Sequence, residues 1–159
     1  MWLLCLLLSA CSGNLMEKEP GTAAGGGGVD AGDPGATCDD AVSVTDNGHH
    51  NPGQPCMQCH KAGGSGPQFT LGGTLYDGLN SNTGIDGATL RIVDANGTEV
   101  ALHSALNGNF YTTQSLVFPL TVSGSKCPDT KPMFSPVNEN GADCNSAGCH
   151  DSTFRIHLP

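Results

Sequence analysis

The sequence is short of aromatic and of basic residues. Aromatic side chains make up 5% of the 159 residues and apolar residues 37%, which is little for a domain that buries a core unaided. We therefore expect part of the chain to be linker, or to be organised by a cofactor or by disulfides. Six Lys and Arg stand against fifteen Asp and Glu, for a net charge of −9 without any basic cluster. This balance excludes binding to a nucleic-acid backbone.

Long hydrophobic runs are also missing, apart from the N-terminal stretch MWLLCLLLSACSG. About ten apolar residues are too few to cross a bilayer, which takes about 20, but they suit the core of an export signal. The ending Leu8-Ser9-Ala10-Cys11 resembles the lipobox of lipoproteins, although the basic residues that usually precede it are absent. The resemblance implies a signal peptide over 1–10 and a diacylglycerol on Cys11. A buried hydrophobic helix is the alternative interpretation.

Residues 11–48 are rich in Gly, Ala, Asp and Pro and poor in large apolar groups. Such a segment cannot bury enough surface to offset its conformational entropy, which predicts a flexible, disordered tether behind the lipid anchor. We therefore expect an exported protein, lipid-anchored in the cell envelope. The expected place is an outer membrane, with the folded part on its periplasmic or surface side.

The stretch from 69 to 124 has a different texture, in which short alternating apolar runs are separated by Gly and Asn turns. In ATLRIVD alternate apolar side chains share one face, as in a half-buried strand, and Asn96-Gly97 then leads into TEVALHS. This order predicts a hairpin. The runs FTLGGTLYD, NFYTT and LVFPLTVSG bring the number to about five strands, with no convincing helix. The predicted fold class is mainly β, a small antiparallel β-sandwich with irregular segments at both ends.

The glycines and turns of this region follow the order GGTLYDG…GIDGATLRIVDANGTEV…LNGNFYTT. This order is similar to carboxypeptidase regulatory-like domains, small transthyretin-like sandwiches found in exported proteins. The resemblance covers about a third of the chain. It implies a structural or binding module and carries no catalytic residues. An unrelated small β domain is the alternative.

Two Cys…Cys-His elements flank the β region, CMQCH at 56–60 and the wider CNSAGCH at 144–150. Both resemble the attachment motifs of c-type cytochromes, in which two thiols add to the vinyl groups of haem and the following histidine binds the iron. The resemblance implies two covalent haem c groups, one on the segment 49–68 and one on 125–159. The implied haem-binding residues are Cys56, Cys59, His60, Cys144, Cys149 and His150.

A haem iron in an electron carrier usually takes a second axial ligand. His50 and His157 lie close to the two motifs in the sequence and are the preferred candidates, so the predicted iron ligands are His60, His150, His50 and His157. His103 falls in a predicted strand, where a structural role is expected. Met133 is a weaker candidate.

The remaining cysteines are accounted for in the same scheme. Cys5 leaves with the signal peptide, Cys11 takes lipid and four cysteines become thioethers. Cys38 and Cys127 are left, and outside the cytoplasm they are expected to form one disulfide. Closing a loop of about 90 residues would stabilise the fold by roughly 4–5 kcal/mol on the chain-entropy argument. It would also draw both haem segments to one end of the sandwich.

The sequence thus predicts a membrane-anchored dihaem electron carrier, not a catalyst, that exchanges electrons with other redox proteins of the envelope. Four alternatives remain open. The two cysteine pairs could hold zinc, or the six cysteines could form three disulfides. The chain could be a haem-free, disulfide-stapled β module that binds a carbohydrate or a surface protein, or an enzyme with an open haem iron.

Overall fold

The computed structural model describes residues 38–159. The predicted signal peptide, the lipidation site Cys11 and the predicted tether up to residue 37 lie outside the described residues. The strands are β1 (Leu71–Tyr76), β2 (Thr89–Val93), β3 (Glu99–His103), β4 (Asn109–Thr112), β5 (Thr121–Lys126), β6 (Asp129–Pro132) and β7 (Ile156–His157), and the 3-10 helices are η1 (Cys56–Gln58) and η2 (Glu139–Gly141). Within 38–159, no helix has the length and apolar character that crossing a membrane requires.

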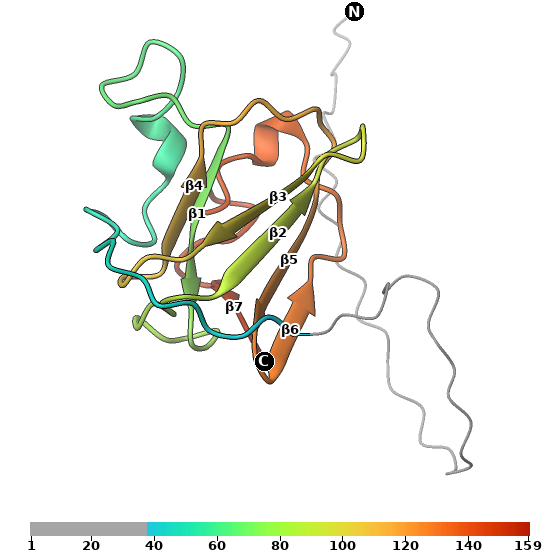
Figure 1. Ribbon diagram of the computed structural model, residues 1–159. Helices are drawn as coiled ribbons and strands as arrows, with labels where there is room; N and C mark the ends of the chain where they lie inside the picture. The colour runs from blue at the N-terminus through green and yellow to red at the C-terminus, as the bar shows by residue number, and fades with distance from the viewer. Residues whose placement is uncertain (1–37) are drawn as a thin grey trace, which may run out of the picture. The chain divides into compact units, whose positions relative to one another are not determined.

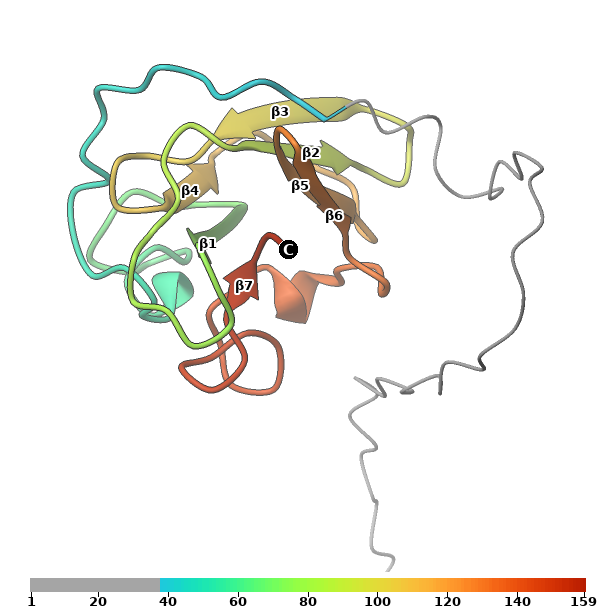
Figure 2. The same cartoon turned by 90° about the horizontal axis from the view of Figure 1, so that it is seen from below.

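The strands form two sheets, with the orders β4-β1-β7 and β3-β2-β5-β6. All pairs are antiparallel except β1 with β7, which is parallel. Figure 2 shows the two sheets on opposite sides of the core, with the C-terminal residues between them. The prediction of a mainly β fold is confirmed.

The core lies between the sheets and is lined by alternate side chains of their strands. Leu71 and Leu75 of β1 are fully buried, and Leu90 and Ile92 of β2 face them from the other sheet. Leu158, next to the C-terminus, is buried in the same cluster. The end of the chain is therefore a part of the core.

The five strands predicted from alternating apolar residues are all present. In LVFPLTVSG the strand β5 begins only at Thr121, because Pro119 has no N–H to donate to a ladder. Leu116 and Phe118 still pack against the core, so the alternation continues where the strand does not. The short strands β6 and β7 were not predicted, since DTKP and IH carry no apolar alternation.

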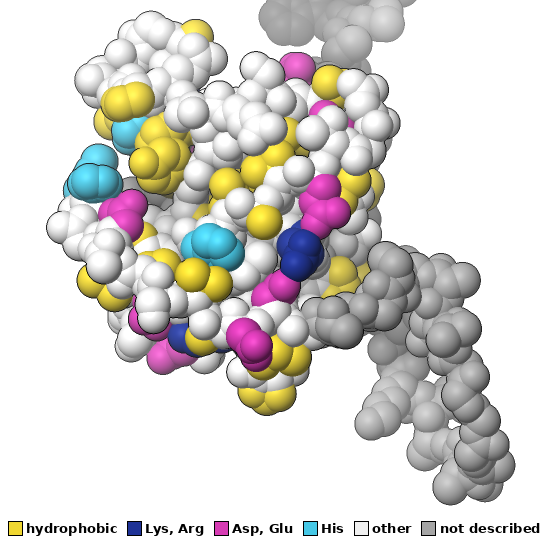
Figure 3. Space-filling model, viewed as in Figure 1, with side chains coloured by type: hydrophobic (Ala, Val, Ile, Leu, Met, Phe, Trp, Pro, Cys, Tyr) yellow, Lys and Arg dark blue, Asp and Glu magenta, His cyan; other side chains and the backbone are white. Residues whose placement is uncertain are grey.

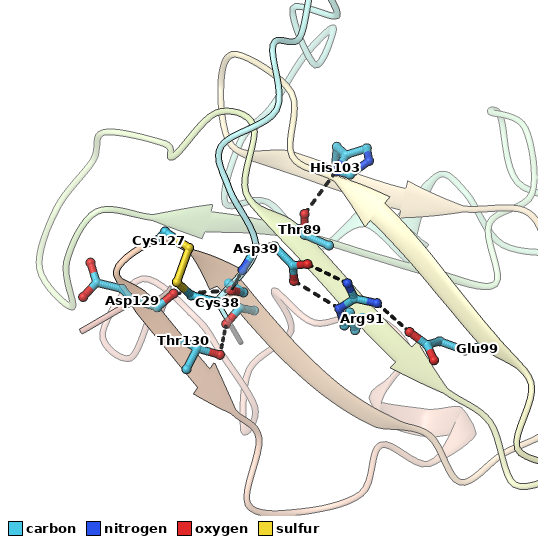
Figure 4. A network of polar contacts seen from close by, with 11 residues as sticks. Cys38, Asp39, Thr89, Arg91, Glu99, His103, Cys127, Asp129 and Thr130 are labelled. Carbon is cyan, nitrogen blue, oxygen red and sulfur yellow. Dashed lines mark hydrogen bonds and ion pairs between the residues drawn. A yellow bond between two sulfur atoms is a disulfide. The ribbon is translucent and has the colours of Figure 1, made fainter. Parts of the chain in front are cut away.

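Residues 38–48 were predicted to belong to the tether, but they are bonded to the folded part (Figure 4). Cys38 forms a disulfide with Cys127, which follows β5. Asp39 accepts an N–H from Cys127 and makes a bidentate ion pair with Arg91 on β2. Farther along, Val42 N–H donates to Gly87. The segment before the first Cys…Cys-His element is therefore fixed against the sheet β3-β2-β5-β6.

Candidate functional site

The first Cys…Cys-His element forms the helix η1 and the turn after it. The backbone N–H groups of Cys56 and Met57 donate to the two carboxylate oxygens of Asp143, at 2.9 and 3.1 Å. His60 N–H then donates to Cys56 O at 3.0 Å. The acidic side chain thus satisfies the free N–H groups at the start of this helix. The conformation of CMQCH depends on a residue almost ninety positions away.

The ring of His60 is buried and held on two sides. Its Nδ1 lies 2.7 Å from the carbonyl oxygen of Pro67. The ring stacks on Phe69 with centroids 3.9 Å apart, and Phe69 in turn stacks on Tyr111 at 4.2 Å. Because a carbonyl only accepts hydrogen bonds, Nδ1 is the donor, and in the neutral ring the lone pair is then on Nε2. This is the arrangement that orients a metal-binding imidazole.

A cavity of about 540 Å³ lies next to this ring. Its wall includes Cys56, Cys59 and His60, and also His50. The ring centroids of His50 and His60 are 5.9 Å apart. Figure 3 shows histidine and apolar side chains close together on the side of the molecule that carries β4 and the segment before β1. The volume lies in the range of about 300–1,000 Å³ that small-molecule and cofactor sites use.

His50 lies in a loop with an unusual backbone. His49 and Asn51, on either side of it, have φ values of 59° and 48°, in the left-handed region that residues other than glycine rarely adopt. The side chain of Asn109, at the start of β4, donates to the carbonyl oxygens of Gly48 and His50, both at 2.9 Å. The strained loop is therefore held in place from a strand.

The two thiols of the first element differ in exposure. Cys59 is exposed and Cys56 is half-buried. Burial, together with the nearby Asp143 carboxylate, raises the pKa of Cys56 to about 11. The thiol form is therefore favoured at neutral pH. A redox dithiol needs the opposite, a thiolate with a lowered pKa.

The second element is built differently. Cys144 is 7% exposed and belongs to the hydrophobic core, and burial raises the pKa of its thiol. It packs against Gly73 of β1, where an added Cβ would lie 2.8 Å from the Cβ of Cys144. A glycine inside a strand often marks such a close approach. Cys149 is half-buried.

The two histidines near the C-terminus also differ. The Nδ1 of His150 lies 3.2 Å from the carbonyl oxygen of Phe154, whose ring stacks on it at 5.6 Å. Burial lowers the pKa of His150, which favours the neutral, ligating form. In His157, Nδ1 donates to Arg155 O at 3.0 Å and Nε2 lies 2.9 Å from Lys131 Nζ. Both nitrogens of His157 are thus in use, and it presents no free lone pair as an iron ligand.

Other residues considered as ligands lie away from the cavity wall. The ring of His103 is on β3, 3.4 Å from the hydroxyl of Thr89, and Met133 is packed against the core. Across residues 38–159 no three His, Cys, Asp or Glu side chains come together in a group that could hold a metal ion. Neither cysteine pair forms a disulfide, and the one disulfide among the described cysteines joins Cys38 to Cys127.

The structure also reveals contacts that the sequence did not indicate. Pro67 and Phe69 both contact His60. Their closeness to His60 in the sequence was the only indication of these contacts. Tyr111 comes from β4, far from them in the sequence. Asp143 and Asn145 flank Cys144, but nothing in the motif shows that they contact the first element.

Comparison with protein families, with curated proteins and with solved structures finds no match for this chain.

Proposed function

We propose that this protein is an extracytoplasmic electron carrier of the c-type cytochrome kind, with one haem bound at the first Cys…Cys-His element. One observation carries the proposal: two thiols, the ring of His60 and the ring of His50 line a single cavity. These are the groups that covalent attachment and two axial iron ligands require.

The residues of the cavity have separate roles in this proposal. Cys56 and Cys59 anchor the haem as thioethers. His60 is the proximal ligand through Nε2, since Nδ1 donates to Pro67. His50 is the ligand on the other face, and two imidazoles favour a low reduction potential. When bound, the haem supplies reversible one-electron chemistry at its iron, and the chain supplies fixed ligands and an apolar wall.

A second haem at Cys144, Cys149 and His150 is a separate part of the proposal, with weaker support. The ring of His150 is oriented like that of His60, by an Nδ1 contact to a carbonyl and a stacked phenylalanine. The thiol of Cys144, however, packs in the core and would have to leave it to form a thioether. The support for one haem is therefore better than the support for two.

The proposed cellular setting rests on the N-terminal sequence alone. Cys11 would carry the lipid, and the segment after it would let the folded part reach other envelope redox proteins.

The test is the absorbance of the full chain made in a host that matures c-type cytochromes. We expect bands of low-spin haem that survive extraction with acidified organic solvent. They should interconvert reversibly on reduction and oxidation and should not change with carbon monoxide. Absence of covalent haem would refute the proposal, and a large response to carbon monoxide would indicate an open, enzyme-like site instead.

A haem-free binding module of the envelope is the second candidate. It is favoured by Tyr111, which is 42% exposed and stacks on Phe69 at the edge of the same cavity. Exposed aromatic platforms of this kind bind sugars and other partners. This candidate, which includes the similarity to carboxypeptidase regulatory-like domains, requires that the mature protein carry no haem.

A further inference from the structure

The loop that carries His50 is held by side chains and not by a strand ladder. Over residues 48–57, six backbone groups bond to four side chains that lie 21 or more positions away in the sequence. Asn109 and Asp143 account for four of these bonds, as described above. Thr74 Oγ1 accepts the N–H of Gly53 at 2.8 Å, and Asn145 Nδ2 donates to Gln54 O at 3.1 Å. The path of the loop is therefore set by these four residues.

Three of the four residues form one continuous network. Asn145 Nδ2 donates to Thr74 Oγ1 at 3.0 Å, and Thr74 Oγ1 donates to Asn109 Oδ1 at 2.7 Å. Asn145 Oδ1 also accepts the Thr74 N–H at 3.1 Å. Thr74 and Asn145 are 0% and 4% exposed. Loss of any one member would leave buried polar groups without partners, which is costly. Because its members satisfy one another, the network should be rigid.

The network begins inside the second Cys…Cys-His element, which is itself fixed to β1. Cys144 N–H donates to Gly72 O, and Gly72 N–H donates to Ala142 O. With the thiol of Cys144 in the core, Asp143 and Asn145 project from a rigid edge toward the first element. A chain of bonds thus runs from the second element through β1 and β4 to the carbonyl of His50.

We propose that the stretch from Asp143 to Asn145 works as a clamp for the first haem site, and that Asn145, Thr74 and Asn109 are positioning residues that hold His50 across from His60. The inference rests on the proposed function. It assigns the second element a role in the axial ligation of the first haem, whether or not the second element carries a haem of its own.

The experiment compares Asn145→Ala and Asn109→Ala in the full haem-bearing chain, with His50→Ala as the reference for a lost ligand. Asn138→Ala is the matched control, because Asn138 precedes η2 and makes no side-chain capping bond. We expect the two network variants to keep their covalent haem and to show a high-spin fraction that binds carbon monoxide. Added imidazole should restore the low-spin spectrum in both of them and in His50→Ala. The control should behave like the unmodified protein.

A second readout does not depend on the iron. Amide hydrogen exchange at Gly53 should become at least about tenfold faster in Thr74→Val, whose shape is conserved while the hydroxyl is lost. This variant also serves if Asn145→Ala does not accumulate as folded protein. The exchange rate in Asn138→Ala should be unchanged.

The outcomes separate the two claims. If the unmodified protein carries no covalent haem, the proposed function fails and the inference fails with it. If haem is attached but Asn145→Ala and Asn109→Ala remain low-spin and silent toward carbon monoxide, the clamp alone is refuted. Unchanged exchange at Gly53 in Thr74→Val would also refute it.

Discussion

The two Cys…Cys-His elements place their histidines alike and their thiols differently. In each, the histidine Nδ1 faces a backbone carbonyl and the ring stacks on a phenylalanine. The thiols of the first element lie on a cavity wall, one of them exposed, whereas Cys144 is buried in the core. The difference shows that two elements with similar histidine geometry can differ in the exposure of their thiols. Access to the thiols is the feature that ranks the two candidate sites.

Removal of the thiols should give the largest effect and test the ranking directly. In Cys56→Ala/Cys59→Ala, we expect complete loss of haem attached to the peptide that contains His60, because no thioether can form there. The matched variant is Cys144→Ala/Cys149→Ala, which should keep that haem. Peptide mass mapping measures both. If the peptide that contains His60 carried haem only when Cys144 and Cys149 were also present, the first element would not be the better haem site.

Loss of the disulfide should lower the free energy of unfolding. It should not change which of the two Cys…Cys-His elements binds haem better. Cys38 and Cys127 are 89 residues apart in sequence, and closure of a loop of that length contributes roughly 4–5 kcal/mol on the chain-entropy argument. We expect Cys38→Ala/Cys127→Ala to lower the free energy of unfolding in urea by an amount of this order. The haem absorbance of the protein that remains folded should be unaltered. A loss below about 1 kcal/mol would mean that the bridge does not constrain the unfolded chain.

Substitution of single cysteines sharpens the contrast in burial. Cys144→Ser places a hydroxyl in the core, where Ala142 O, the acceptor of the thiol, lies 3.9 Å from Sγ, too far for a hydroxyl hydrogen bond. Burial of such a hydroxyl costs about 1–3 kcal/mol. Cys59→Ser, at an exposed position, should be within about 0.5 kcal/mol of the unmodified protein. Urea unfolding of the haem-free chain compares the two. Equal effects would contradict the core position of Cys144.

The smallest expected effect is on the pH dependence of stability, to which the carboxylates of Asp39 and Asp143 should contribute differently. The hydrogen bond from Arg91 lowers the pKa of Asp39 below its ordinary value of 3.8. The stabilisation from Asp39 is therefore complete above pH 3.8 and is lost as the pH falls through the lowered value. Burial raises the pKa of Asp143 above 3.8. Its contribution is therefore greatest below pH 3.8 and declines as the pH rises through the raised value.

The matched variants for this test are Asp39→Asn and Asp143→Asn. The difference in unfolding free energy between the unmodified protein and each variant should change with pH in opposite directions, in windows below and above pH 3.8. Slopes of the same sign would contradict the assigned environments.

The sequence predicted those parts of the fold that local patterns determine. The alternation in ATLRIVD and TEVALHS gave β2 and β3, with the turn at Gly97 between them. The strands β6 and β7 escaped prediction because they are short and polar and exist through pairing with β5 and β1. The extent of the tether was overestimated, since its composition gave no sign of the bonds that fix residues 38–48.

Of the candidate site, only the residues that we propose to hold the haem could be predicted from the sequence. The cavity wall includes four residues that lie within eleven positions of one another, namely His50, Cys56, Cys59 and His60. Because they are neighbours in the sequence, their closeness in space could be expected. The role of Asn145 depends on contacts across about 90 residues, through Thr74, which no local pattern encodes. The contact of His157 Nε2 with Lys131 on β6, at 2.9 Å, also joins segments far apart in the sequence and could not be read from it.

The most direct test of the central claim is the intact mass of the mature full chain from a cytochrome-maturing host, with fragmentation to locate the haem. We expect a covalent haem on Cys56 and Cys59, together with one disulfide between Cys38 and Cys127. A mature chain whose mass includes no haem, with all its cysteines free or in disulfides, would contradict it.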